Sequence, residues 1–264
     1  MTALMMKQQW QQMAETNPFF GITSWPEFED PTHLDLEFFW DIGRTHARNL
    51  LQKVPLRRSE QLSMVEIGCG VGRMTHYFAE RFARVTAMDI SGEMVSRAQR
   101  YWRHLDNVRF IEGSGADLMP VADAEVDFVL SFYVLNHVTD PETVLGYVHE
   151  TGRVLKNGGH ALLHMRVRDL DAWSPVRLRS RLRRIGRPAS KQLWWNQGVT
   201  RREREMKTDL IGQFSKHDAW HGCEVPWPAL VDALARARLE AVWTDVAELG
   251  PTEFAFLVLR KQAP

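Results

Sequence analysis

The 264-residue sequence is poor in several features that would mark particular classes of protein. Its only two cysteines, Cys69 and Cys223, are too few for a disulfide framework or a thiolate metal site. His and acidic residues do not cluster at ligand spacings, so we expect no metal. The sequence has no apolar run near the roughly 20 residues of a membrane span, and no basic segment followed by an apolar core. With 33 basic and 33 acidic side chains, we therefore expect a soluble, cytoplasmic protein.

The most informative run spans residues 65–73 and reads Val-Glu-Ile-Gly-Cys-Gly-Val-Gly-Arg. Three glycines at alternate positions, Gly68, Gly70 and Gly72, let the backbone turn sharply after a strand and approach a ligand closely. A dinucleotide fingerprint has glycine at its first, third and sixth positions, but the sixth position here is Arg73. The preceding carboxylate, Glu66, suits the amino group of an amino acid better than a diphosphate.

This run resembles motif I of the class I S-adenosylmethionine-dependent methyltransferases, which reads acidic-x-Gly-x-Gly-x-Gly. The likeness is to the small-molecule members with a methyltransferase-11/25-like core. A second acidic residue, Asp89, ends the next expected strand, 84–89, at the spacing at which a carboxylate accepts the ribose hydroxyls. The resemblance implies that S-adenosylmethionine is the cofactor and that Ile90 lies against its adenine. The first cofactor-binding residues that it implies are Glu66, Gly68, Cys69, Gly70, Gly72, Arg73, Asp89 and Ile90.

Two further segments extend the resemblance to residues 62–167. After an expected strand at 108–112, Ser114, Gly115 and Ala116 stand where the family contacts the adenine edge. Ser114 replaces the commoner acidic residue, for which Asp117 is a possible substitute. The expected fourth strand ends in Ser131 and Phe132, which complete the implied cofactor site.

The order of elements predicts an α/β fold with a Rossmann-like, seven-stranded, mostly parallel sheet and helices on both faces. We expect four parts: an N-terminal helical lid (1–60), the cofactor-binding core (61–167), a basic, tryptophan-containing insert or cap (168–222), and a C-terminal helix with two antiparallel strands (223–264). The lid is rich in aromatic residues, which could instead be ordinary packing against the sheet. In the insert, seven basic residues and no acidic ones lie within 172–192, and the alternative to an anion-binding cap is a solvated helix or loop.

Methyl transfer from a sulfonium requires mainly alignment of the reacting atoms, and a base only where the acceptor is protonated. His137, which follows the expected fourth strand, is the candidate base, and Tyr133 is its polar neighbour. A structural role for His137, bonding backbone or capping, is the competing interpretation. His33, His164 and His221 have no local motif.

The sequence after the fourth strand reads Ser-Phe-Tyr-Val at 131–134, not the Asn/Asp-Pro-Pro-aromatic sequence of methyltransferases that act on bases and protein amines. We therefore expect methyl transfer to an O or N atom of a small acceptor, acidic or aromatic in character, with nucleic acid disfavoured. Two alternatives stay open: an RNA or protein methyltransferase that uses the arginine-rich insert, and a non-catalytic interaction module.

Overall fold

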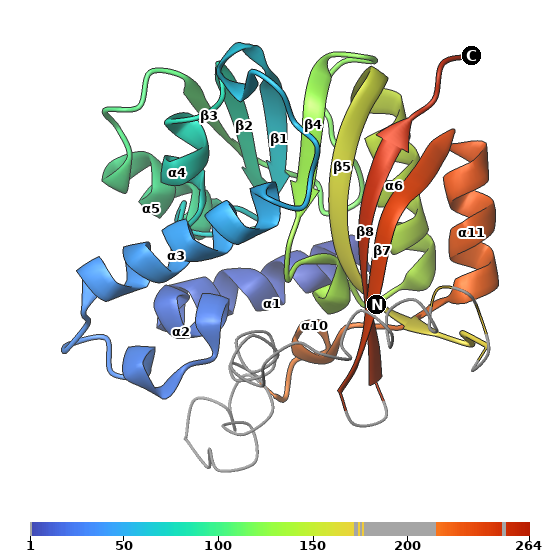
Figure 1. Cartoon of the computed structure of the whole chain (residues 1–264). Helices are drawn as coiled ribbons and strands as arrows, with labels where there is room; N and C mark the ends of the chain where they lie inside the picture. The colour runs from blue at the N-terminus through green and yellow to red at the C-terminus, as the bar shows by residue number, and fades with distance from the viewer. Residues whose placement is uncertain (1, 172–173, 175, 177–214, 250–251) are drawn as a thin grey trace, which may run out of the picture.

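The structure is a computed structural model that describes residues 2–171, 174, 176, 215–249 and 252–264. Its centre is one twisted sheet of eight strands in the order β3-β2-β1-β4-β5-β8-β7, with β6 paired to β5 (Figure 1). The strands are β1 (Ser63–Ile67), β2 (Arg84–Asp89), β3 (Val108–Glu112), β4 (Val126–Ser131), β5 (Leu155–Arg168), β6 (Val225–Pro226), β7 (Leu239–Leu249) and β8 (Thr252–Lys261). β1 to β6 run parallel, whereas β8 is antiparallel to both β5 and β7.

The strand order reverses between β1 and β4. The chain passes from β1 to β2 and β3 on one side, and then returns to place β4 and β5 on the other. Ile67 at the end of β1 is in register with Met88 on β2 and with Ser131 on β4. The loops that follow these strands therefore emerge side by side at one edge, which is where ligands bind in open α/β sheets.

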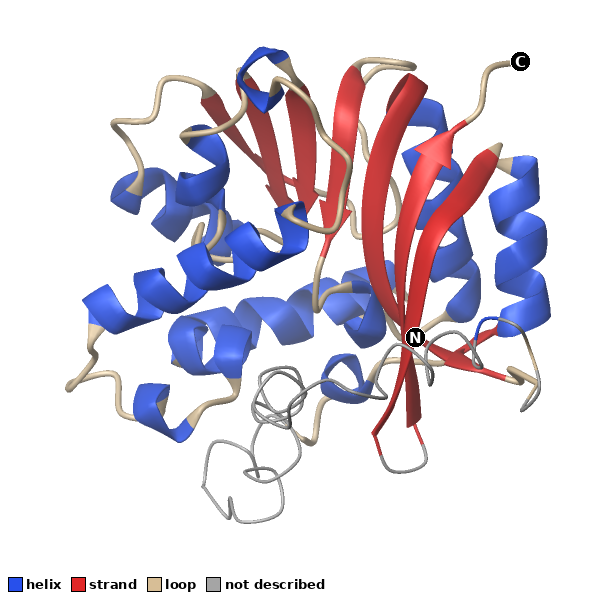
Figure 2. Ribbon diagram, viewed as in Figure 1, coloured by secondary structure: helices blue, strands red, loops and turns tan. Residues whose placement is uncertain are grey.

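Helices cover both faces of the sheet, as the colouring by secondary structure makes clear (Figure 2). They are α1 (Ala3–Thr16), α2 (Pro18–Thr23), η1 (Pro26–Phe28), α3 (Leu36–Leu51), η2 (Ser59–Gln61), α4 (Thr75–Ala79), α5 (Gly92–Tyr101), η3 (Leu135–His137), α6 (Pro141–Val154), α10 (Asp218–His221) and α11 (Trp227–Arg236). Because successive strand residues face opposite sides, Val65 and Ile67 join one core, with α6 and α11, while Met64 joins the other, with α3 and α4. Glu66 shares the face of Met64, which is why its carboxylate is buried.

Helix α1 crosses the carboxyl ends of the strands and is fastened there by polar contacts (Figure 1). The Oε1 atom of Gln11 accepts hydrogen bonds from Ser91 Oγ at 2.8 Å and from the Glu93 amide at 3.1 Å, at the start of α5. The Ala219 amide of α10 donates to Gln9 Oε1 at 3.0 Å. α1 therefore joins the start of α5 to a segment that lies more than 100 residues further along the chain.

The expected α/β fold with helices on both faces of a mostly parallel sheet is confirmed, and the predicted bounds of β2 and β3 match the structure. Two local details differ. β5 begins at Leu155, directly after α6, so Gly158 and Gly159 lie within a strand. The short strand β6 was not predicted. Asn17 ends α1 and caps α2 by accepting a hydrogen bond from the Phe20 amide. The arginine-rich run of the expected insert, together with residues 173, 194 and 195, lies outside the described residues.

Candidate cofactor and acceptor site

The loop after β1 is a tight turn in which all three motif glycines adopt positive φ, between 55° and 82°. A Cβ at Gly68 would lie 2.1 Å from the Val134 side chain, and one at Gly70 would lie 2.7 Å from Ile22. A Cβ at Gly72 would instead lie 2.5 Å from Trp102, so this glycine serves packing behind the loop. Both the backbone conformation and the surroundings therefore require glycine at these positions.

Asp89, at the end of β2, fixes the position of the glycine loop. Its Oδ2 accepts a hydrogen bond from the Gly70 amide at 2.8 Å, and its Oδ1 accepts one from the Ser91 amide at 2.9 Å. The amides of Gly68 and Cys69 donate to the Met88 carbonyl at 2.7 and 2.9 Å. The carboxylate thus lies beside the loop, and burial raises its pKa despite these amide donors.

Glu66 and Arg73 bring two buried ionisable groups to the same end of the cavity. Glu66 is 1% exposed, its Oε2 accepts from Thr75 Oγ1 at 2.6 Å, and its Oε1 has no hydrogen-bond partner among the described residues. Burial raises the pKa of Glu66 to about 8, although Thr75 and the charge of Arg73 oppose the rise. Arg73 donates from Nη1 to His46 Nδ1 at 3.1 Å, while its buried Nε has no partner in the described part of the chain.

The turn after β4 supplies the polar groups at the other end. Tyr133 adopts a left-handed conformation, with φ of 57°, and its amide donates to His164 Nδ1 at 3.3 Å. His137 Nδ1 lies 3.0 Å from the carbonyl oxygen of Trp220. Since a carbonyl only accepts, the proton is on Nδ1 and the lone pair of the neutral ring is on Nε2. Burial, with the charge of Arg166, lowers the pKa of His137 to about 4.

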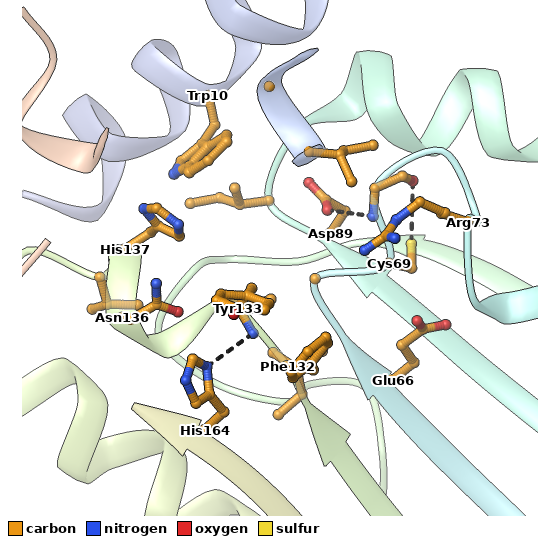
Figure 3. Close-up of a pocket in the computed structure, with 18 of the residues that line it drawn as sticks. Trp10, Glu66, Cys69, Arg73, Asp89, Phe132, Tyr133, Asn136, His137 and His164 are labelled. Carbon is orange, nitrogen blue, oxygen red and sulfur yellow. Dashed lines mark hydrogen bonds between the residues drawn. The ribbon is translucent and has the colours of Figure 1, made fainter. Parts of the chain in front are cut away.

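These groups line one cavity of about 1100 Å³ at the carboxyl ends of the strands. Figure 3 shows Glu66, Cys69, Arg73 and Asp89 on one side and Asn136, His137 and His164 on the other, with Phe132 and Tyr133 between them. We call these sides the cofactor end and the acceptor end. Of the residues predicted from the sequence, the cavity is lined by Glu66, Gly68, Cys69, Gly70, Arg73, Asp89, Ile90, Gly115, Phe132, Tyr133 and His137.

Four predicted residues do not line the cavity: Gly72, Ser114, Ala116 and Ser131. The Ser114 hydroxyl accepts from the amides of Ala116 and Asp117 at 3.1 and 3.2 Å, so it is engaged in its own turn. Ser131 is fully buried, and its Oγ has no hydrogen-bond partner within the described residues. Asp117, the alternative to Ser114, does line the cavity.

Several lining residues carry no local sequence signal for a site. They come from α1, α2, α3 and the paired strands β5 and β8, and include Trp10, Ile22, His46, Arg166, Phe254 and Phe256. Trp10 contacts His137 edge to face, with 5.4 Å between ring centroids. Two sequence signals were available: the aromatic content of the N-terminal segment and the alternation of apolar residues in β8. Neither predicts which residues come into contact across the fold.

Comparison with known proteins agrees with this geometry. Residues 65–163 match the family model described as methyltransferase domain. A human thiol S-methyltransferase is 32% identical over 104 residues, or 38% of this chain and 41% of that protein. The malonyl-[acyl-carrier protein] O-methyltransferase of Pectobacterium atrosepticum is 30% identical over 121 residues, or 46% of this chain and 44% of that protein. The chain thus spans about two fifths of the length of these curated relatives.

A solved structure extends the agreement to the fold. The YcgJ protein of Bacillus subtilis superposes with a TM-score of 0.53 at 16% identity, over 83% of this chain and 100% of that one. The fold and site define a Rossmann-like domain for a nucleoside cofactor. The match over residues 65–163 and the named methyltransferase relatives support the resemblance of the glycine motif to the class I S-adenosylmethionine-dependent methyltransferases.

The cofactor end fits S-adenosylmethionine, the cofactor of this family, on the chemistry of its own residues. The amino acid part of that molecule carries an ammonium and a carboxylate, and the cavity offers Glu66 Oε1 and Arg73 Nε, both buried and unpartnered within the described residues. The glycine loop lacks the Cβ atoms that would fill the space above it, and Asp89 offers acceptors for hydroxyl groups. Within the described residues, no group of three His, Cys, Asp or Glu side chains could hold a metal ion.

None of the helices that the structure describes is both long enough and apolar enough to span a bilayer.

Proposed function

We propose that the protein transfers the methyl group of S-adenosylmethionine to an oxygen or nitrogen atom of a small acceptor. The observation that carries the proposal is the pairing, in one cavity, of the Glu66–Arg73–Asp89 set with a separate aromatic and histidine-lined end. When bound, the sulfonium supplies an activated methyl group. The two ends of the cavity would hold the acceptor atom, the methyl carbon and the sulfur in line, so that the methyl group would pass to the acceptor while the electrons of the carbon–sulfur bond stay on sulfur.

The chain's own residues position the partners in this proposal. Glu66 and Arg73 orient the two charged groups of the methionine part, and Asp89 accepts hydrogen bonds from the ribose. Ile90 forms part of the apolar wall for the adenine. It packs so closely against Gly115 that a Cβ at Gly115 would lie 2.3 Å from Ile90 Cδ1. Helices α1 to α3 act as the lid expected from the sequence, since Trp10, Ile22 and Phe38 line the cavity.

His137 is the proposed base for acceptors that carry a proton. The hydrogen bond to the Trp220 carbonyl holds the tautomer with the lone pair on Nε2, and burial keeps the ring neutral at physiological pH. The acceptor's proton passes to Nε2 as the new bond forms. Tyr133 shapes the space beside it, with its ring 4.7 Å from that of His164.

Calorimetric titration with S-adenosylhomocysteine, followed by turnover with a panel of acids, phenols, amines and thiols, tests the proposal. We expect Asp89→Asn to weaken binding by roughly 1.5–3 kcal/mol, or about tenfold to 150-fold, because the isosteric amide cannot accept both ribose hydrogen bonds as a carboxylate does. Asp106→Asn, at an exposed aspartate between α5 and β3, is the matched control. Equal affinity of wild type and Asp89→Asn would refute the assignment, and absence of any binding would refute the function.

A further inference from the structure

Two histidines at the acceptor end each have one ring nitrogen engaged by the backbone. His137 Nδ1 lies 3.0 Å from the carbonyl oxygen of Trp220. His164 Nδ1 lies 3.3 Å from the amide nitrogen of Tyr133. His137 comes from η3 and His164 from β5, and both rings line the same cavity. Neither a sequence motif nor the proposed methyl transfer assigns a role to His164.

The backbone partners fix opposite tautomers on the two rings. A carbonyl only accepts, so His137 carries its proton on Nδ1 and offers the lone pair of Nε2. A backbone amide only donates, so His164 Nδ1 holds a lone pair and the proton of the neutral ring is on Nε2. Burial keeps His164 neutral by lowering its pKa to about 3, and the charge of Arg166 acts in the same direction. The acceptor end therefore has one histidine that accepts a hydrogen bond and one that donates.

The Nε2 edge of His164 is the part of its ring that a ligand can use. Phe256 and Phe254 stack against the ring, with centroids 4.1 and 5.4 Å from its own. Nδ1 is taken by the Tyr133 amide, and no residue in the described part of the chain accepts a hydrogen bond from Nε2. The side chain is 1% exposed, yet it lines the cavity beside Tyr133 (Figure 3). Buried donors are almost always hydrogen-bonded, so a bound acceptor molecule has to supply the missing partner.

The chemistry of this donor favours an uncharged oxygen as its partner. A neutral imidazole supplies one N–H and no charge, which matches a carbonyl oxygen. A carboxylate at the same place would favour the protonated ring, which burial opposes. A charge on His137 would lower the pKa of His164, so the two rings lie near enough for one compact molecule to reach both.

We propose that His164 donates a hydrogen bond from Nε2 to a carbonyl oxygen of the methyl acceptor. The inference rests on the proposed function and narrows the substrate class of the same cavity to hydroxy ketones. The hydroxyl oxygen of the acceptor bonds to the methyl carbon while its proton passes to His137 Nε2, and the electrons of the carbon–sulfur bond stay on sulfur. The carbonyl oxygen does not react and is held by His164, which is thus a specificity-determining residue.

A matched pair of probes tests this without knowledge of the natural acceptor. 7-Hydroxy-1-indanone and 4-indanol share one bicyclic frame and one hydroxyl, but only the first has a carbonyl in place of the methylene beside it. Both phenols are uncharged in mildly acidic buffer. Binding of each is measured by calorimetry, with and without saturating S-adenosylhomocysteine. We expect wild type to prefer the ketone by about threefold to tenfold, the size of one neutral hydrogen bond.

Two substitutions separate the roles of the two ring nitrogens of His164. In His164→Asn the side-chain oxygen can still accept from the Tyr133 amide, but the donor at Nε2 is lost, so the preference for the ketone should disappear. In His164→Gln the amide nitrogen reaches the position of Nε2, and most of the preference should remain. His160→Asn is the control, because His160 is also on β5 but does not line the cavity, and its preference should equal that of wild type. Thermal unfolding checks that each variant folds.

Heteronuclear NMR of the histidine rings tests the tautomers without any ligand. In neutral buffer we expect the proton of His164 on Nε2 and that of His137 on Nδ1. A proton on His164 Nδ1 would overturn the inference. So would equal affinities for the two probes in wild type, absence of binding of the ketone, or a preference that persists in His164→Asn.

These outcomes differ from failure of the proposed function. Loss of S-adenosylhomocysteine binding by wild type would refute the methyltransferase assignment. The ring tautomers and the preference for the ketone are both measured in the absence of that ligand as well.

Discussion

Replacing Glu66 by glutamine should stabilise the protein at high pH while weakening its cofactor site. The side chain is 1% exposed, and among the described residues its carboxyl group has a single hydrogen-bond donor, the Thr75 hydroxyl, at 2.6 Å. Burial raises its pKa from the ordinary 4.5 to about 8. Between these pH values the folded protein holds a proton that the unfolded chain has released, so the free energy of unfolding falls as pH rises.

The size of the effect follows from the same values. A gap from 4.5 to about 8, at about 1.4 kcal/mol for each pKa unit, corresponds to roughly 5 kcal/mol of unfolding free energy lost between pH 4.5 and pH 9. Glutamine keeps an acceptor for the Thr75 hydroxyl but does not titrate. The stability of Glu66→Gln minus that of wild type should therefore grow with pH by about 1.4 kcal/mol per unit through this window and level off above pH 8.

Urea unfolding at half-unit steps from pH 5 to pH 9 measures this difference. Glu60→Gln, at an exposed position in η2, provides the control and should give a nearly flat difference curve. Binding of S-adenosylhomocysteine by Glu66→Gln should be weaker by roughly 1.5–3 kcal/mol above pH 8, where wild-type Glu66 is ionised and the ammonium would lose a charged partner. If the unfolding curves of Glu66→Gln and wild type stay parallel across the pH range, Glu66 is not a buried carboxyl with a raised pKa.

Two further substitutions address the glycine loop and the proposed base. Gly70→Val should reduce cofactor affinity by at least about tenfold and cost about 1–3 kcal/mol of stability, because φ is 55° there and a Cβ would lie 2.7 Å from Ile22. Gly146→Ala in α6 is its control, because the nearest atom to a new Cβ there is 3.8 Å away. An unchanged cofactor Kd for Gly70→Val would rule out the glycine loop as part of the cofactor site. His137→Gln should lower kcat by about a hundredfold or more with little change in cofactor Kd. Because protonation removes the lone pair, wild-type kcat should be constant above pH 5.5 and fall as pH drops through about 4, and a midpoint near 6.5 would contradict this environment for His137.

Short-range chemistry made the cofactor half of the molecule predictable. The bounds of β2 and β3 follow from apolar runs of five or six residues, and the start of α6 follows from Asp140 as N-cap and a proline at the first helical position. The positions of Gly68, Gly70 and Asp89 at one edge follow from two parallel strands that end together. Each of these features depends only on residues within about 25 positions of one another, so a local sequence pattern is enough to predict it.

The acceptor half depends on long-range pairing that no local pattern contains. Arg166 meets Phe254 only because β5 pairs with β8, about 90 residues away along the chain. In the same way, the lone pair of His137 is on Nε2 because the Trp220 carbonyl comes from a separate segment. Ser114 does not line the cavity, and the reason is different. Its hydroxyl accepts hydrogen bonds from the amides of Ala116 and Asp117, two and three residues ahead. These local bonds compete with ligand contact, and the position of Ser114 in the family motif does not reveal them.

The docking of α1 has a consequence for how molecules pass in and out of the protein. This one helix contributes Met6, near Gly115 at the cofactor end, and Trp10, against His137 at the acceptor end. Its fastenings to Ser91 and Ala219 lie on opposite flanks of the cavity. A single movement of α1 would therefore uncover both compartments together, so that exchange of the spent cofactor and departure of the methylated product would share one gate.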